Sequence, residues 1–301
     1  MLNYDRLSRR PNTFRSFTGL ELSEFDFVYE KVKAKYEEYE RQRLSQKPRK
    51  NRVGAGRPFK LSLRDRLLML FVYYRLYITS TLTSYLFDLN QSNVLKDIRK
   101  LEPLVREVMP IPERIYAATR RANTPEEVEK YFPDFKAFID ATEQEIPRPG
   151  RSDKRKTHYS GKKKRHTVKT QITVNKDGLI IHKAKHARGR RHDYDIFKKS
   201  RPRLPPGVEP TLDLGYEGVQ KGFPELNAHI PIKRRRKDEK LTDEQRLYNR
   251  SLAKARIVVE HTFSRMKKFR VMGEEFRNRL KNYDMMTDIV AGLVNLRIMG
   301  A

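Results

Sequence analysis

The sequence predicts an α/β protein in which a mixed sheet flanked by helices follows an all-helical region. Apolar residues recur with the helical period as far as about residue 108, strand-like runs begin at about residue 136, and a long helical pattern returns near Asp243. Strands that alternate with helices and end in a long helix are typical of a sheet covered by helices. The length of 301 residues permits two domains, and 37% hydrophobic residues can form a core.

The charge balance favours a polyanionic partner. The chain carries 66 Lys and Arg against 38 Asp and Glu, which gives a net charge of +28. A charge of this size gathers polyanions, so nucleic acid is the first candidate and an anionic membrane surface the second. No apolar run approaches the roughly 18 residues that a transmembrane helix needs, and the first residues lack the layout of a secretory signal. The absence of Cys rules out disulfides and thiolate ligands for zinc, and fits a cytoplasmic protein.

The first element expected is a helix over residues 23–43, with one apolar face and a charged rim. A stretch rich in Pro, Gly and basic residues follows at 47–58 and includes Arg52 and Arg57. It has no apolar period, so it predicts a basic arm that contacts DNA or, with equal weight, a solvated linker.

The next elements expected are a helix over residues 63–77, a short helix over 79–87 and a third helix that opens at Gln91. A short helix, a tight turn and a helix with a polar first turn are typical of a helix-turn-helix, whose second helix reads the major groove. The expected reading residues are Gln91, Ser92, Asn93 and Lys96. An ordinary three-helix bundle without DNA contact fits the same pattern, and the basic arm favours DNA.

The second half of the chain predicts the sheet. Pro103, Pro110 and Pro112 interrupt the helical pattern first. The expected strands are residues 138–142, 167–174, 179–183, a run that ends at Asp213, and 228–232. The turn at 175–178 between the second and third of these is a hairpin signal. The expected helices are residues 193–199, a long helix from Asp243 past Glu260, and 283–299.

Three carboxylates stand out in this half: Asp140 and Asp213 at expected strand ends, and Glu260 within the long helix. Open sheets place ligands at strand ends. Three such acids can hold two Mg²⁺ ions, which clamp the attacking and leaving oxygens of a phosphoryl displacement. A lone Asp after an apolar run is more often a cap or turn residue, but three in consistent settings on a basic chain favour a nuclease-type site.

The long helix presents charged residues near its acid. Arg256, Glu260 and Lys267 fall within roughly 60° of one another on one helix face. Arg256 is expected to pair with Glu260 or with a phosphate, and Lys267 to reach a phosphate further along. The alternative is an ion pair on a solvated helix, which contributes only a few tenths of a kcal/mol.

Together these motifs resemble the DDE transposases of bacterial insertion sequences, specifically the insertion-sequence-five-like branch that is related to the eukaryotic Harbinger transposases. The likeness covers about residues 136–270, with the helix-turn-helix matching that branch's amino-terminal domain. The residues that carry it are Ile139-Asp140-Ala141-Thr142, Tyr159-Ser160-Gly161-Lys162-Lys163-Lys164-Arg165-His166, Asp213-Leu214-Gly215-Tyr216-Glu217-Gly218, and Arg256 with Glu260 and Lys267. One departure is Ala253, where related transposases often have Tyr.

The resemblance implies a ribonuclease-H-like catalytic domain in which Asp140, Asp213 and Glu260 hold two Mg²⁺ ions, for which Mn²⁺ substitutes. It implies that Asp140 touches both ions and that His192 and Asp193 support the site from behind. The implied reaction is hydrolysis at the element's ends, followed by attack of the released 3′-hydroxyl on target DNA. The rivals are a helix-turn-helix regulator, a domesticated transposase that binds without catalysis, and a nuclease that cuts without joining.

The expected partners are the element's terminal inverted repeats and target DNA, bound by a homodimer or larger assembly at the bacterial nucleoid. Further basic residues expected on DNA are Lys162, Lys163, Lys164, Arg165, Arg190 and Arg191. The expected organisation is an N-terminal helical segment (1–46), a basic linker (47–60), a helix-turn-helix domain (61–110), a connector (111–135) and a catalytic domain (136–301).

Overall fold

The computed structural model describes residues 1–46, 48, 52, 55, 58–234 and 240–300. The chain packs as two units. Unit 1 comprises Met1–Met109, Lys268–Gly273 and Met285–Ala301, and unit 2 comprises Pro110–Lys267 and Glu274–Asp284. The last helix therefore packs mainly with the N-terminal residues, while the five-part functional division expected from the sequence remains a prediction. In the described part of the chain, no helix is long and apolar enough to cross a membrane.

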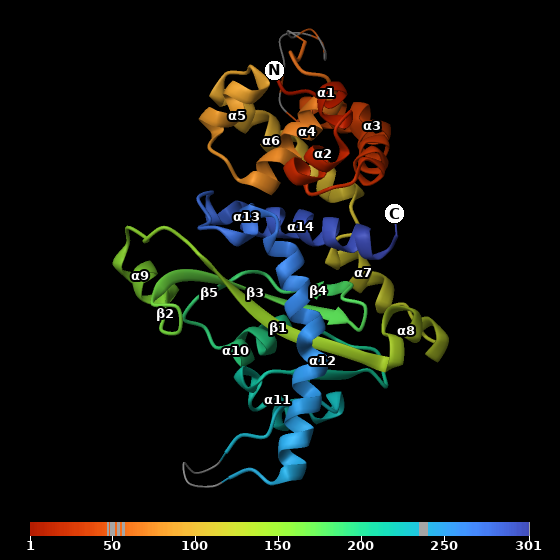
Figure 1. Ribbon diagram of the computed structural model, residues 1–301, viewed down its shortest axis with the longest axis vertical. Coiled ribbons are helices and arrows are strands. Elements are labelled where there is room, and N and C mark those ends of the chain that lie inside the picture. Colours follow the sequence, from red (N-terminus) through yellow and green to blue (C-terminus); the bar gives the residue numbers. More distant parts are fainter. Residues whose placement is uncertain (47, 49–51, 53–54, 56–57, 235–239, 301) are drawn as a thin grey trace. The chain divides into compact units, whose positions relative to one another are not determined.

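Unit 1 is built from helices (Figure 1). They are α1 (Tyr4–Ser8), α2 (Pro11–Thr18), α3 (Leu22–Ser45), α4 (Leu63–Leu76), α5 (Ser80–Phe87), α6 (Gln91–Val108), α13 (Arg270–Gly273) and α14 (Tyr283–Ile298). The helix expected over residues 23–43 is α3, and the three expected around the turn are α4, α5 and α6. The expectation that Pro103 interrupts the pattern is wrong, since Pro103 lies inside α6.

The centre of unit 1 is α4, which is buried along most of its length. Phe71 on this helix packs edge-to-face on Phe25, and Phe25 packs on Phe14 and Tyr4. Arg66 is 1% exposed and pairs with Asp97 at 3.3 Å, so a buried ion pair joins α4 to α6. Since a helix buried on all sides needs neighbours on all sides, α4 forms the hub of the unit.

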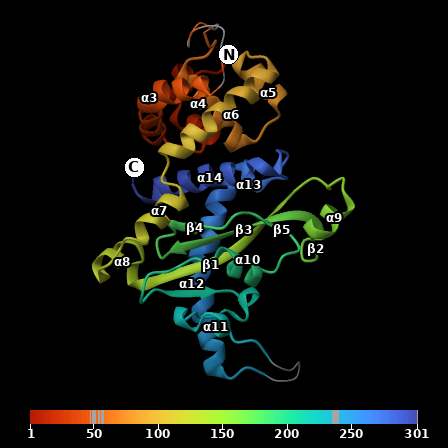
Figure 2. The ribbon, with the colours of Figure 1, turned by 180° about the vertical axis from the view of Figure 1, so that it is seen from behind.

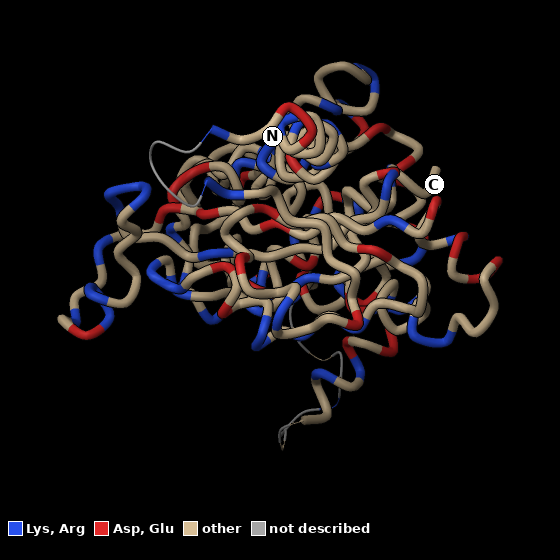
Figure 3. The backbone as a smooth tube through the Cα atoms, turned by 90° about the horizontal axis from the view of Figure 1, so that it is seen from below, with Lys and Arg blue, Asp and Glu red and all other residues tan. Residues whose placement is uncertain are grey.

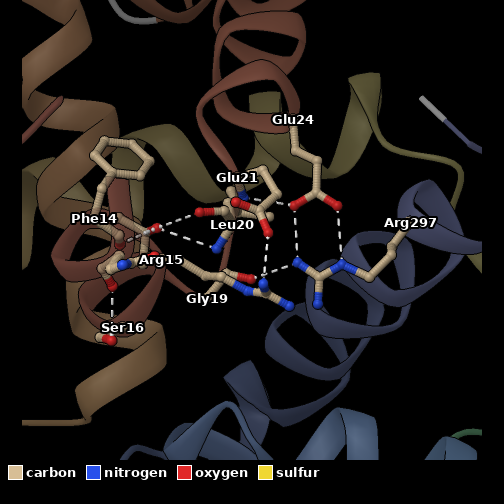
Figure 4. A network of polar contacts seen from close by, with 10 residues as sticks. Phe14, Arg15, Ser16, Gly19, Leu20, Glu21, Glu24 and Arg297 are labelled. Atoms are coloured by element: carbon tan, nitrogen blue, oxygen red, sulfur yellow. Dashed lines mark hydrogen bonds and ion pairs between the residues drawn. The ribbon is translucent and has the colours of Figure 1, made fainter. Parts of the chain in front are cut away.

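The two ends of the chain meet in unit 1 through a charged network (Figure 4). Arg297 on α14 donates from Nε and Nη2 to the two carboxylate oxygens of Glu24 on α3, at 2.9 and 2.8 Å. Its Nη2 also donates to the carbonyl oxygen of Gly19 at 2.8 Å. A two-pronged contact of this kind is among the stronger polar interactions, and here it fixes α14 against the start of α3.

Unit 1 contains a carboxyl group whose burial makes stability depend on pH. Glu102 on α6 is 6% exposed and accepts a hydrogen bond from Tyr74 Oη at 2.9 Å. Burial raises the pKa of Glu102 to about 7. In the unfolded chain that pKa is about 4.3, so the folded state binds the proton more tightly. The stabilisation that protonated Glu102 gives the folded state is complete below the unfolded-state pKa and is lost as the pH rises through about 7.

In wild type, the free energy of unfolding is expected to fall by about 3 kcal/mol as the pH rises from 4.5 to 8 because Glu102 ionises. In Glu102→Gln this fall is expected to be absent. Urea unfolding followed by circular dichroism at pH 4.5 and pH 8 measures this difference for wild type and variant. Glu107→Gln, at an exposed position of the same helix, is the control and should follow wild type. Identical pH profiles for wild type and Glu102→Gln would contradict the prediction.

Unit 2 is a mixed sheet flanked by helices, which confirms the predicted fold class. Its strands are β1 (Lys136–Glu145), β2 (Tyr159–Ser160), β3 (Arg165–Asn175), β4 (Ile180–Lys183), β5 (Ala187–Arg188) and β6 (Glu209–Leu212). The order is β2-β3-β1-β6, with β4 and β5 also paired to β3. The β1–β6 pair is parallel and the others are antiparallel. The helices of this unit are α7 (Pro112–Thr119), α8 (Pro125–Tyr131), α9 (Ser152–His158), α10 (Asp193–Ser200), α11 (Val219–Gly222) and α12 (Asp243–Lys267).

Helices cover both faces of this sheet. Ile139 packs with Phe197 of α10 and Val219 of α11, whereas Asp140 contacts α12. Consecutive strand residues point to opposite faces, so α12 lies on one face and α10 with α11 on the other. Figures 1 and 2, which are views from opposite sides, show α12 running across the sheet. The core of the α10 face also includes Leu212, Tyr216 and Ile230.

One local expectation for unit 2 is wrong. Residues 228–232 do not form a strand, because their pairing is limited to one bridge between His229 and Thr211. The basic tract after β1 contains a short helix, α9. Lys and Arg in the last turn of α9 face the negative end of the helix dipole, which stabilises this short helix.

Candidate active site

Asp140 and Asp213 lie side by side where the parallel pairing of β1 and β6 ends. Ile139 pairs with Leu212 in the register, and the two aspartates are the next residues on the neighbouring strands. The expectation that Asp140 ends a strand is wrong, because β1 continues to Glu145 along its other edge, where it pairs with β3. Both acids nevertheless follow the carboxyl end of a parallel pair, where α/β sheets place ligands.

One guanidinium joins the two carboxylates. Arg256 on α12 donates from Nη1 to Asp213 Oδ1 at 2.9 Å and from Nη2 to Asp140 Oδ2 at 3.2 Å. The Arg256 side chain is 13% exposed, against 19% for Asp140 and 47% for Asp213. Its Nε is buried and has no hydrogen-bond partner among the residues that the structure describes. The arginine therefore serves the carboxylates with its two end nitrogens alone.

The pKa values of two groups at this edge, Asp140 and Tyr216, are raised. Burial raises the pKa of Asp140, and the neighbouring Asp213 raises it further, while Arg256 and the Ala141 N–H, which donates to Oδ1 at 2.7 Å, act in the opposite direction. The pKa of Tyr216 is also raised well above its ordinary value, by burial and then by the charges of Asp140, Asp193 and Asp213. One guanidinium thus only partly offsets the negative charge gathered at this edge.

The donor set suits a hard cation in part. Asp140 and Asp213 each direct a carboxylate oxygen to the same cationic group, and carboxylate oxygens are ligands that Mg²⁺ takes in proteins. Glu260 lies one turn after Arg256 on α12 and is exposed. Across the residues that the structure describes, no three His, Cys, Asp or Glu side chains are grouped so as to hold a metal ion. The structure therefore brings two of the three expected ligands together and leaves Glu260 apart.

Of the two partners expected for Arg256, the pairing with Glu260 is wrong and the contact with a phosphate stays a prediction. The i, i+4 spacing allows that pair, but two carboxylates from neighbouring strands offer a stronger site than one exposed side chain. Lys267, further along the same helix, is an exposed residue. Desolvation of its ammonium group and then the positive charge of Lys163 lower the pKa of Lys267.

Asp193 supports the same edge of the sheet from the α10 face. A Cβ on Gly215 would lie 2.9 Å from Asp193 Oδ2, so the residue two places after Asp213 must be small. Asp193 accepts from Lys169 Nζ at 2.9 Å, and Glu143 lies 3.8 Å from the same nitrogen. His192 is the exposed residue that precedes α10. Lys169 and Glu143 were not expected in this setting, and their spacing in the sequence gives no signal for it.

The expected reading residues lie at the start of α6 in unit 1. Gln91, Ser92, Asn93 and Lys96 are all exposed. Asn90 caps the helix by accepting from the Ser92 N–H at 2.9 Å, and Gln91 Nε2 donates to Ser80 Oγ on α5 at 2.7 Å. The α5–turn–α6 arrangement, with a polar exposed first turn on α6, is the geometry of a helix-turn-helix.

The other expected DNA-binding residues are dispersed. Lys162, Lys163, Lys164 and Arg165 are exposed in the turn that enters β3, and Arg190 and Arg191 are exposed before α10. Arg52 is exposed, whereas Arg57 lies outside the described residues. Lys and Arg are spread over many segments of the backbone (Figure 3). Such a distribution suits a long polyanion better than a single small anion.

Comparison with known proteins gives consistent matches. Residues 139–295 match the family model of the DDE superfamily endonuclease, and residues 59–111 match that of the helix-turn-helix of DDE superfamily endonuclease. The chain is 30% identical over 288 residues to the probable transposase for insertion sequence element IS702 of Microchaete diplosiphon, covering 95% of this chain and 94% of that protein. It is 25% identical over 222 residues to the putative transposase for insertion sequence element IS112 of Streptomyces albus G, covering 73% and 75%. No solved structure matches.

Proposed function

Because this chain belongs to the DDE superfamily of insertion-sequence transposases, we propose that it binds the terminal inverted repeats of its own element, cuts the DNA there and joins the ends to target DNA. The observation that carries the proposal is the placement of Asp140 and Asp213 next to each other at the end of the parallel pair, joined by a cationic group. The helix-turn-helix supplies the DNA-reading element.

The proposed reaction consists of two displacements at phosphorus. In the first, water attacks the phosphodiester at the element end, the bond from phosphorus to the 3′-oxygen breaks, and that oxygen leaves as a 3′-hydroxyl after taking up a proton. In the second, this hydroxyl loses its proton and attacks a target phosphodiester, whose own 3′-oxygen leaves. One bond to phosphorus forms and one breaks in each step, so strand transfer needs no external energy source.

The DDE superfamily implies the use of a divalent metal. We assign Asp140, Asp213 and Glu260 as its ligands, with two Mg²⁺ ions or Mn²⁺ in their place. When bound, such ions lower the pKa of the attacking water or hydroxyl and stabilise the leaving oxygen. The neighbouring positions of Asp140 and Asp213 at the end of the β1–β6 pair support this assignment. Glu260 is one helical turn after Arg256, which donates to both aspartates, and this spacing supports its inclusion.

Several finer statements belong to the same proposal. The family branch is the insertion-sequence-five-like one, and the catalytic unit is ribonuclease-H-like. His192 and Asp193 act from behind the metal ligands, as the contact of Asp193 with Gly215 supports. The protein acts as a dimer or larger assembly on paired element ends, in the cytoplasm at the nucleoid. The dispersed basic residues hold the DNA backbone.

The test is a strand-transfer assay on labelled duplex DNA that carries the sequences flanking the encoding gene, with and without Mg²⁺. Wild type is expected to give metal-dependent cut and joined products, and Glu260→Gln to lose both by at least about 100-fold. Glu244→Gln, on the first turn of the same helix, is the control and should keep wild-type activity.

The rivals give different results in this assay. Cutting without joined product would indicate a nuclease. DNA binding with no cleavage by wild type would indicate a regulator or a domesticated transposase, a reading that the separation of Glu260 from the two aspartates favours. Full activity of Glu260→Gln would remove that residue from the metal site.

A further inference from the structure

Unit 2 contains an open basic cavity away from the paired aspartates. It has a volume of about 620 Å³ and lies between the segment that runs from β4 through β5 to Arg191 and the C-terminal half of α10. The cations that line it include Lys185, Arg188, Arg191 and Lys199. Its volume falls within the range of pockets that bind ligands, roughly 300–1,000 Å³, but its charged lining does not suit an apolar molecule. We call it the basic cavity.

The acid that lines the basic cavity is already neutralised. Asp284 accepts from the His186 backbone N–H at 2.9 Å, its other oxygen lies 2.8 Å from His186 Nδ1, and Lys183 Nζ is 3.3 Å away. These contacts hold the pKa of Asp284 well below its ordinary value, against the effect of burial. The network therefore fixes the wall of the cavity and leaves no free carboxylate among the described lining residues.

The remaining cations face the cavity without acidic partners. Lys185, Arg188, Arg191 and Lys199 are exposed, and none of them forms an ion pair with another described residue. Four like charges around one cavity repel one another, and a bound polyanion relieves that repulsion. Lys198, the neighbour of Lys199, is different because it pairs with Asp195 at 3.0 Å.

The basic cavity is close to the candidate active site. Asp140 pairs with Ile172, and Ile172 pairs with Lys183. The backbones of Asp140 and Lys183 are therefore separated by two strand spacings, which together are roughly 10 Å. A second link runs through the start of α10. Arg191 is two residues before Asp193, which packs against Gly215 beside Asp213.

We propose that the basic cavity is a second DNA-backbone site of the catalytic unit, which binds phosphates of the element-end strand within about five nucleotides of the scissile bond. Arg188 pairs with Val168, which pairs with Gln144, four residues after Asp140. Two strand spacings and four residues along the strand give roughly 16 Å, and one strand carries a phosphate every ~3.4 Å along the helix axis. The cavity holds the strand in place while its neighbouring phosphate reacts. This proposal rests on the proposed function for the identity of the DNA, but not on cleavage.

The test measures binding without divalent metal, so it is decided even if the protein never cuts. Full-length wild type is titrated with element-end duplexes in which single phosphates are replaced by uncharged methylphosphonates. One to three positions near the end are expected to lower affinity about tenfold. In Arg188→Ala/Lys199→Ala, which removes a cation from each wall, the same substitutions are expected to have no further effect. The slope of log affinity against log salt should fall by about 1 to 2.

The control is Lys130→Ala/Lys221→Ala, which removes two exposed cations, one on α8 and one on α11. It lowers the net charge by as much as Arg188→Ala/Lys199→Ala does. It should keep the wild-type pattern of sensitive phosphates. Lys185→Ala/Arg191→Ala provides a second cavity variant if the first one fails to fold. Sensitivity to the same phosphates in both cavity variants, or no sensitive phosphate in wild type, overturns the proposal. One further outcome also overturns the proposal. If inorganic phosphate stabilises wild type but not the cavity variants, and no methylphosphonate has an effect, the cavity binds a free anion instead.

Discussion

Replacing Asp140 by Asn is expected to lower the rate of DNA cleavage by at least about 100-fold and to leave DNA binding in place. Loss of a group that only orients a metal ligand costs about 10–100-fold in activity, so loss of a proposed ligand costs at least the upper end of that range. Asn keeps the shape of Asp and an oxygen that can accept the Ala141 N–H, so β1 is preserved. Single-turnover cleavage of a labelled element-end duplex in Mg²⁺ measures the effect.

The matched control is Asp134→Asn. Asp134 is an exposed carboxylate of the same unit, and its backbone has a φ of 54°, which Asn adopts readily. This variant should cleave at the wild-type rate. Wild-type cleavage by Asp140→Asn would show that the pair of aspartates is not the reaction centre and would leave the DNA-binding rivals standing.

Replacing Arg256 by Gln is expected to raise the affinity of the metal-free protein for Mn²⁺ about tenfold. Arg256 occupies an oxygen of Asp140 and an oxygen of Asp213, and both hydrogen bonds must break or shift before those oxygens can bind a metal. A hydrogen bond to a charged group contributes about 1.5–3 kcal/mol, and 1.4 kcal/mol corresponds to tenfold in affinity.

Calorimetric or electron paramagnetic resonance titration with Mn²⁺, in the absence of DNA, measures this effect independently of activity. Arg250→Gln, at an exposed position of the same helix, is the control and should bind Mn²⁺ as wild type does. Weaker Mn²⁺ binding by Arg256→Gln would mean that the guanidinium positions the carboxylates for the metal rather than competing with it.

Periodicity predicted the elements of this protein well, because burial of one face leaves a local record in the sequence. The helices α3 to α6, the β3–β4 hairpin and the two acids at the end of the β1–β6 pair all follow from runs of fewer than about 25 residues. The resemblance to DDE transposases predicts that three carboxylates belong together, and the structure brings Asp140 and Asp213 together but not Glu260.

Partners that lie far apart in the sequence could not be predicted in the same way. Arg256 meets Asp213 and Asp140 across 43 and 116 residues, and the nearby Glu260 was the more obvious partner by spacing. His186 and Asp284, which build a wall of the basic cavity, are 98 residues apart. A residue pattern reports which face is buried, but not which other segment buries it.

The contact between Arg297 and Glu24 also sets an order on the making of the protein. The two residues are 273 positions apart, and a chain grows at about 5–20 residues per second, so Glu24 waits roughly 14–55 s for its partner during synthesis. Through that interval the N-terminal helices have a carboxylate without its guanidinium and lack α14. The DNA-reading helices thus reach their final packing only when translation of the catalytic unit is complete, and a prematurely terminated chain carries them without that support.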